Sequence, residues 1–320
     1  MIHKHLKYYT THIKQDIPAG IVVFLVALPL CLGIAMASGA PLFSGLIAGL
    51  IGGIVVSWLS GSQLSVSGPA AGLTVIVFNA IEQLGSYNGF LVCVVLAGII
   101  QLVLGYLRAG IIGAFFPTSV IKGMLAAIGL ILIIKQLPHA VGYDGSFQGD
   151  ESYMNETAVS SFHDVFLALG SMSMSSTLIT LGALLILILW ETAFLKNIKR
   201  LKSIPSPLVA VSWGIGYNLV AIRWFPEFSV SGKHLVSLPI TDNLNQFIDL
   251  FTFPDISFLS NPQVYMIAIT LAIIASLETL LSLEAVDKLD PLKRVTPTSR
   301  ELKAQGVGNI LSGLIGGLPV

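Results

Sequence analysis

Long apolar runs alternate with short polar stretches along most of this chain. A helix needs about 20 mostly apolar residues to cross the hydrocarbon core of a bilayer. Runs of this kind predict nine membrane spans, at approximately 17–37, 42–59, 66–83, 90–107, 112–135, 175–192, 207–225, 262–284 and 302–318. A tenth span is expected to begin at Pro319. The pattern therefore predicts an all-α polytopic membrane protein surrounded by membrane lipid.

The positive charges predict how these spans are oriented. Cytoplasmic loops of membrane proteins carry an excess of Lys and Arg. With a cytoplasmic N-terminus, only three of the 17 Lys and Arg residues fall outside, namely Lys135, Arg223 and Lys233. The loop at about 136–174 has no Lys or Arg and several acidic residues, so we expect it to be external. Residues 1–16 form a predicted cytoplasmic tail rather than a cleavable signal peptide, whose apolar region would be shorter.

Composition narrows the function classes. The chain is 54% hydrophobic and 11% charged, whereas soluble domains are roughly 25% charged. Its net charge of zero argues against a nucleic-acid partner. Cys31 and Cys93 lie in apolar runs without metal or redox spacing, and the six His residues lie in tails, loops or span ends. We therefore expect neither an enzyme nor a bound metal or other cofactor.

The stretch "QLSVSGPAAGLTVIVFNAI", residues 63–81, places a helix-breaking Gly-Pro pair beside an apolar run. Non-helical backbone at membrane depth persists only when it is buried in protein or lines a wet cavity. Ser67 suits an N-cap and Pro69 suits a first helical turn, so the sequence predicts an extended segment leading into a helix at about Pro69. Such a helix start offers an anion free N–H groups and the positive end of a dipole. Alternatively, Gly-Pro merely ends a loop at the membrane surface.

A carboxylate interrupts the eighth predicted span. Glu278 lies inside "MIAITLAIIASLETLLSLEAVDKLD", residues 266–290. A charge at bilayer depth is costly, so it needs a partner, a proton or a wet cavity. Ser282 lies at i+4 on the same helix face and Thr279 is adjacent, which makes these three residues candidates for coupling to H⁺ or Na⁺. The alternative is a permanently protonated packing residue.

The stretch "GLIGG" occurs twice, at 49–53 and at 313–317. Glycines at this spacing let membrane helices approach closely, so one interpretation is a pair of packing faces. The other is that the repeat marks two related halves of a transporter.

Three blocks of sequence together resemble the sulfate-permease (SulP) family of inorganic-anion transporters, which includes bicarbonate and sulfate carriers. They are "DIPAGIVVFLVALPLCLGIAMASGAPLFSGLIAGLIGG" (16–53), "GSQLSVSGPAAG" (61–72) and "SRELKAQGVGNILSGLIGGLPV" (299–320). The third block is similar to the family's Asn-Arg-Glu-Leu…Gln-Gly…Asn…Gly-Gly-x-Pro run. The resemblance covers essentially the whole chain and is nearest to bacterial members sometimes found with carbonic anhydrase, which favours bicarbonate and a bacterial inner membrane.

This resemblance implies a fold of two inverted seven-helix repeats, the first at about 17–225 and the second beginning at about 262–320. It implies that spans three and ten are half-helices, each preceded by a short strand, whose N-termini face each other across the anion. The acidic and hydroxyl positions of the family's eighth span fall on Glu278 and Ser282. The candidate anion-binding residues are Ser65, Ser67, Gly68, Ala70, Ala71, Gly72, Pro319 and Val320.

The chain departs from the family pattern in two places. In the first span, "LPLCLGIA", Leu30 stands where many members have Gln and Ile34 where an aromatic residue is common. The chain also stops at Val320, before the family's last spans and its cytoplasmic STAS domain. We therefore expect a fragment of a longer protein that forms a homodimer when full length.

Two other functions fit the same pattern of spans. A nucleobase symporter shares the implied architecture, but it needs side-chain hydrogen bonding to a base and usually more polar residues near the break. A sensor or scaffold on the same fold would bind an anion without transporting it.

Overall fold

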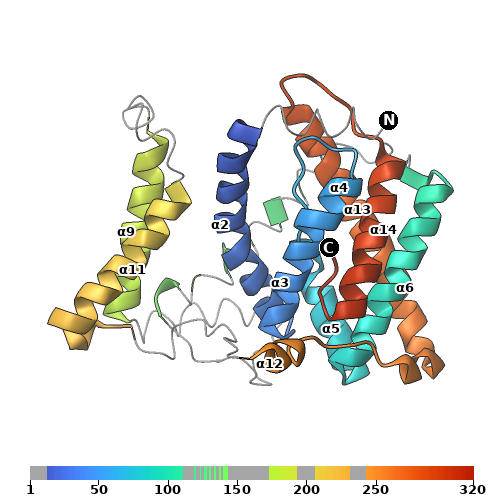
Figure 1. The fold of residues 1–320 in the computed structure, drawn as a ribbon, viewed down its shortest axis with the longest axis horizontal. Coiled ribbons are helices and arrows are strands. Elements are labelled where there is room, and N and C mark those ends of the chain that lie inside the picture. The colour runs from blue at the N-terminus through green and yellow to red at the C-terminus, as the bar shows by residue number, and fades with distance from the viewer. Residues whose placement is uncertain are drawn as a thin grey trace. The chain divides into compact units, whose positions relative to one another are not determined.

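The computed structural model describes residues 13–110, 173–192, 206–230 and 243–320, with scattered positions between 119 and 142. These residues form helices joined by turns and extended segments (Figure 1). Most of the predicted N-terminal tail, most of the predicted span at 112–135 and most of the predicted external loop lie outside them. The helices are α2 (Ile13–Ala37), α3 (Leu42–Ile51), η1 (Gly52–Val56), α4 (Ser57–Leu59), η2 (Ala71–Leu73), α5 (Thr74–Leu84), α6 (Tyr87–Tyr106), α9 (Met174–Glu191), α11 (Ser206–Trp224), η5 (Pro226–Phe228), α12 (Leu244–Ile248), η7 (Ile256–Ser260), α13 (Pro262–Leu289) and α14 (Thr298–Ile315).

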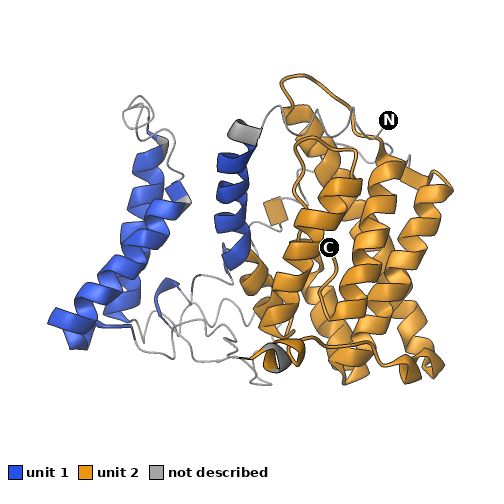
Figure 2. Ribbon diagram, in the orientation of Figure 1, with its two compact units in different colours: residues 1–29, 132–237 blue, residues 30–131, 238–320 orange. Residues whose placement is uncertain are grey.

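The chain divides into two compact units, which are coloured separately in Figure 2. Unit 1 comprises residues 1–29 and 132–237, and unit 2 comprises residues 30–131 and 238–320. The division between them falls inside α2. These units do not correspond to the two repeats predicted at about 17–225 and from about 262. The repeats stay a prediction.

Unit 1 contains the paired helices α9 and α11. Gly182 of α9 faces the indole ring of Trp213 on α11, and there is no room for a side chain at that glycine. At the start of α9, the Ser173 N–H donates to the Val141 carbonyl at 2.8 Å. The hydroxyl of Thr180 donates to the Ala140 carbonyl at 2.7 Å. These bonds attach α9 to the turn that precedes it.

Unit 2 is organised around the contact between α6 and α14. A Cβ added at Gly98 would lie 2.7 Å from the Gly306 carbonyl oxygen, and one at Gly306 would lie 2.8 Å from that of Gly98. The two backbones can approach this closely only because both positions are glycine. In the second "GLIGG", a Cβ added at Gly313 would lie 3.0 Å from the Leu91 carbonyl oxygen. The small-residue packing face predicted there is therefore present.

Local sequence explains where several helices begin and end. The Ser86 hydroxyl accepts from the Gly89 N–H at the start of α6, and the Asn261 side chain caps α13 ahead of Pro262. Gly85 ends α5 with φ of 62°, and Gly316 ends α14 with φ of 91°. Both conformations are left-handed and favour glycine.

Four helices of the described residues are long and apolar enough to cross a membrane: Asp16–Ala37, Leu42–Leu59, Tyr87–Tyr106 and Pro262–Leu289. They confirm the predicted first, second, fourth and eighth spans, with the eighth running five residues further than predicted. The helix of the predicted third span begins later than the span at 66–83, because residues 65–70 are not helical and helix begins at Ala71.

Candidate functional site

The extended segment before α5 meets the chain after α14. The Ala70 N–H donates to the Pro319 carbonyl at 3.1 Å. The short strands implied ahead of the two half-helices are not formed among the described residues. A β-ladder needs at least two backbone hydrogen bonds, and these two segments share a single one, between Ala70 and Pro319. The helix predicted to start at about Pro69 begins two residues later, because Ala70 is extended, with ψ of 109°, and precedes the 3-10 turn Ala71–Leu73.

Ser67 does not cap the helix, contrary to the prediction. Its hydroxyl oxygen instead accepts a hydrogen bond from the Gln305 side-chain nitrogen of α14, at 3.1 Å. On its other side, the Ser67 carbonyl lies against Gly52, the first residue of the π-helical turn η1, where a Cβ would overlap it. The segment around Ser67 is therefore held between η1 and α14. π-helical turns of this kind are frequent at functional sites.

Glu278 reaches the start of the same helix from α13. Its Oε1 accepts a hydrogen bond from the Gly72 N–H at 3.0 Å. A Cβ on Gly72 would lie 2.8 Å from the carboxylate carbon and from both oxygens, so only glycine leaves room for this contact. Thr279 and Ser282 make no hydrogen bond to this carboxylate. The structure thus brings Glu278 and Gly72 together but leaves the two hydroxyl candidates apart from them.

The residues after α14 are fixed by side chains of that helix. The Val320 N–H donates to the Asn309 Oδ1 at 2.6 Å, and the Ser312 hydroxyl donates to the Leu318 carbonyl at 2.6 Å. Asn309 also donates to the Gln101 Oε1 of α6 at 2.6 Å. The Val320 N–H is therefore engaged within the protein, and Pro319 has no N–H to offer. Pro319 and Val320 therefore have no free backbone N–H for an anion, and their candidate role is to border the site with their backbone.

Several hydrogen-bond donors of the candidate site have no partner among the described residues, including the Ala71 N–H and the Ser67 hydroxyl proton. The neighbouring donors, at Ala70 and Gly72, are used by Pro319 and Glu278. Gly68, Ala70 and Gly72, which neighbour these donors, have little or no side chain, so they leave the backbone accessible to a compact ligand. The arrangement suits a small anion better than a large one with several hydrogen-bonding edges.

Sequence reasoning missed the buried polar face of α14. Its members recur about every four residues and contact the non-helical segments on either side of the site. They are Glu301, Gln305, Asn309 and Ser312, each at most 5% exposed. The signal was visible as a four-residue polar period inside an apolar span.

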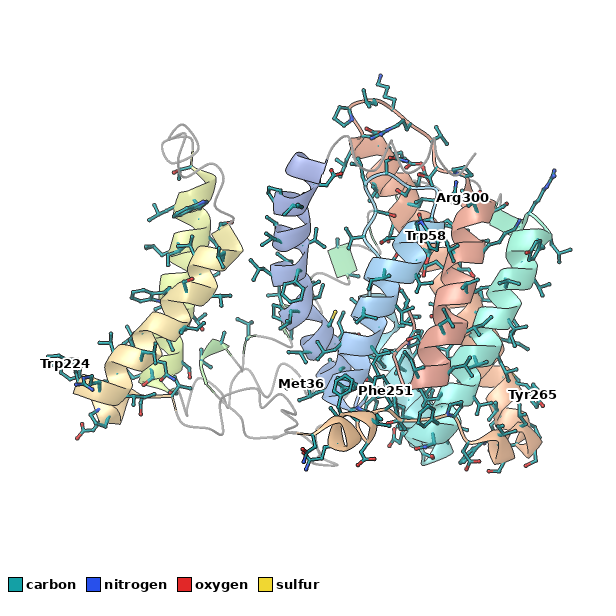
Figure 3. The ribbon with its side chains drawn as sticks, in the orientation of Figure 1. Met36, Trp58, Trp224, Phe251, Tyr265 and Arg300 are labelled. Atoms are coloured by element: carbon teal, nitrogen blue, oxygen red, sulfur yellow. The ribbon has the colours of Figure 1, made fainter. Side chains whose placement is uncertain are left out.

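The first turn of α14 also secures the end of α4. Arg300, labelled in Figure 3 near Trp58, donates from Nε to the Leu59 carbonyl at 2.9 Å. The Glu301 carboxylate accepts from the Ser60 hydroxyl and interacts with the Gly61 N–H and the Gln305 side chain. These contacts fix the chain just before the extended segment begins.

A polar loop joins α13 to α14 outside the predicted spans. Asp290 accepts from the Arg294 Nε at 2.6 Å and from the Leu292 N–H at 3.0 Å. The Arg294 guanidinium, helped by these backbone bonds, lowers the pKa of Asp290 to about 2. Asp287 accepts from the Thr296 hydroxyl at 2.7 Å. On α13, Glu284 pairs with Lys288 at 2.7 Å.

Comparison with known proteins finds relatives along nearly the whole chain. A model described as the sulfate permease family matches residues 13–320. YvdB of Bacillus subtilis is 26% identical over 98% of this chain and 54% of YvdB. The bicarbonate transporter BicA of Picosynechococcus is 26% identical over 98% of this chain and 52% of BicA. The chain therefore spans about half the length of these curated relatives.

One solved structure shows the fold. It is the transmembrane domain of a cyanobacterial bicarbonate transporter, BicA, with a TM-score of 0.66 and 23% identity. The match covers 95% of this chain and 72% of that one. The predicted all-α polytopic membrane fold is confirmed, and the relatives reported above are named as transporters rather than enzymes.

Proposed function

The chain belongs to the sulfate permease family, and on that premise we propose that it carries a small inorganic anion across a membrane by secondary transport. The proposed substrates are sulfate and bicarbonate, and chloride is a third candidate anion. One observation carries the proposal: Glu278 accepts from Gly72 at the start of a helix, and nearby donors at Ala71 and, in the preceding segment, Ser67 have no partner among the described residues.

The anion is proposed to bind at the start of α5, beside Ser67 and Ala71. A helix start carries partial positive charge and attracts an anion without the desolvation penalty of a buried Lys or Arg. Oxygens of sulfate or bicarbonate would accept from the Ser67 hydroxyl and the Ala71 N–H. Gly68 and Ala70 leave space for close approach, while Pro319 and Val320 border the site from the chain beyond α14.

Coupling is proposed to run through Glu278. Its carboxylate and the anion are both attracted to the positive end of α5, so two negative charges meet there. A proton or Na⁺ on Glu278 would remove that repulsion, and anion binding would then favour cation binding by the same free energy. Ser282 and Thr279 would join such a cation site only after a change of rotamer. We propose H⁺ or Na⁺ as the coupling ion.

The setting of this activity is proposed from the relatives. A bacterial inner membrane with a cytoplasmic N-terminus agrees with the distribution of Lys and Arg. A homodimer is proposed for the full-length protein.

The test is uptake of labelled sulfate and bicarbonate into vesicles that contain the protein, under an imposed H⁺ or Na⁺ gradient. Saturable uptake of one anion, stimulated by one gradient, would support both the transport and the coupling. If folded protein binds an anion without uptake, the transport proposal is wrong and a sensor or scaffold fits better. Uptake of a labelled nucleobase instead of either anion would also overturn it.

A further inference from the structure

Helix α14 buries an amide that the proposed transport mechanism leaves unused. Gln305 is 5% exposed, and its Nε2 donates to the Ser67 hydroxyl oxygen at 3.1 Å. Its Oε1 is buried without a partner among the described residues. Burying an amide with an unpaired oxygen carries a penalty. An apolar residue of similar size would avoid that penalty, so the contact with Ser67 is a reason for an amide at this position.

The hydrogen bond to Ser67 places the Nε2 of this amide, and the nearby Glu301 carboxylate favours the same orientation. Glu301 is one turn before Gln305 on the same face of α14 and interacts with its side chain. The Ser60 hydroxyl donates to the same carboxylate. Because a carboxylate accepts, the NH₂ group of Gln305 faces Glu301 and Ser67. Reversing the amide would place Oε1 against the carboxylate oxygens.

This orientation fixes the role of the Ser67 hydroxyl. A serine hydroxyl has one proton to donate and two lone pairs that accept. Gln305 supplies a donor to one lone pair, and the proton has no acceptor among the described residues. The hydroxyl therefore has its donor available for a ligand.

We propose that Gln305 is a positioning residue that keeps the Ser67 hydroxyl available as a hydrogen-bond donor to the transported anion. The inference rests on the proposed function and narrows its substrate class. The oxygen that meets Ser67 must be unprotonated, as every oxygen of sulfate and two of the three oxygens of bicarbonate are. A ligand presenting an N–H or O–H group at this point would face a second donor and bind less well.

The test is a double-mutant cycle on sulfate and bicarbonate binding, measured with the purified protein in nanodiscs. Ser67→Ala removes a hydrogen bond to a charged ligand and is expected to raise the Kd about tenfold. Gln305→Met keeps the side-chain size but frees the Ser67 hydroxyl to rotate. We expect it to raise the Kd about threefold. In the Ser67→Ala background, Gln305→Met should add almost nothing, because there is no hydroxyl left to orient.

Two further variants separate positioning from packing. Gln101→Met also removes a buried amide, but Gln101 contacts Asn309 rather than Ser67, so its effect should add to that of Ser67→Ala. Gln305→Glu can accept the Ser67 proton, and its Kd should approach that of Ser67→Ala. The Tm of each variant shows whether it folds. If Gln305→Glu does not fold, the result for Gln305→Met decides the test.

The outcomes of the cycle are distinct. Non-additive Kd values for Gln305→Met and Ser67→Ala, with additive values for Gln101→Met, support the inference. Additive effects of Gln305→Met, or an unchanged Kd, overturn it while the proposed function stands. If the folded wild-type protein binds neither anion, the proposed function fails, and the inference fails with it.

Discussion

Two carboxylates of unit 2, on Glu278 and Glu301, are held in different ways. Glu301, 1% exposed, accepts from the Ser60 hydroxyl and interacts with the Gly61 N–H and Gln305. Glu278, in the middle of α13, accepts one hydrogen bond among the described residues, from the Gly72 N–H. The first is enclosed by donors on several sides, and the second has one donor at a helix start.

The difference shows how one membrane-embedded fold can use the same side chain for two purposes. A carboxylate with several donors around it stabilises the segments that it joins, and releasing it is costly. A carboxylate with one fixed donor keeps lone pairs for a proton or a cation. We therefore assign structural attachment to Glu301 and coupling to Glu278, and the predictions below test that assignment.

The largest effect on stability is expected from Glu301→Ala. Removing the carboxylate leaves the Ser60 hydroxyl and the Gly61 N–H without their acceptor, and we expect a loss of about 3 kcal/mol in the free energy of unfolding. Unfolding in detergent, followed by circular dichroism, measures it. Glu284→Ala is the control, because Glu284 pairs only with Lys288 on the surface and should change stability by less than about 0.5 kcal/mol. Equal losses in the two variants would contradict the assignment.

Gly72→Ala is expected to have the next largest effect on stability and to abolish coupling. Its Cβ would lie 2.8 Å from the Glu278 carboxylate, so the acid must move away from the helix start. Overpacking of this kind costs about 1–3 kcal/mol. The matched control is Gly53→Ala, since no atom lies within 4 Å of a Cβ built there. Full cation-stimulated uptake by Gly72→Ala would be inconsistent with a role for this contact.

Glu278→Gln is expected to change stability by less than about 1 kcal/mol, because the amide oxygen still accepts from the Gly72 N–H. Glu301→Gln should cost more, since the amide replaces an oxygen with a donor that faces the Ser60 hydroxyl or Gln305. Comparing the Tm of the two variants measures this difference directly. A greater loss for Glu278→Gln would reverse the assignment.

The smallest effect is expected at Asp290, whose carboxylate lies outside the spans. Its pKa in the folded protein is about 2, below its ordinary value because of Arg294 and the backbone donors. A lowered pKa contributes stability that is complete above about pH 4 and is lost as the pH falls through 2. The Tm difference between wild type and Asp290→Asn should thus be constant above pH 4 and shrink towards pH 2. A difference independent of pH would contradict this.

Much of the fold followed from the sequence because long apolar runs have few alternatives in a membrane. The runs at 87–106 and 262–289 became helices close to their predicted limits. The start of α5 was misplaced, because Ser67 and Pro69 are also favourable in an extended segment. Which of the two forms depends on tertiary partners, here Pro319 and Gln305, that local preference cannot reveal.

The site was predicted less completely than the fold. Glu278 stood out because an acid inside an apolar run demands an explanation. Its partner could not be read from the sequence, since Gly72 lies 206 positions away along the chain. Gln305 and Asn309 were overlooked because their role is to hold backbone and hydroxyl groups of distant segments, and a residue type alone does not show this.

The measurement that tests the central claim most directly compares anion uptake by wild type and Glu278→Gln under imposed H⁺ and Na⁺ gradients. The claim is that the carboxylate at the start of α5 links cation binding to anion transport. The account predicts that one gradient stimulates uptake by the wild type, and that the folded variant loses this stimulation. Equal stimulation of both proteins would contradict it.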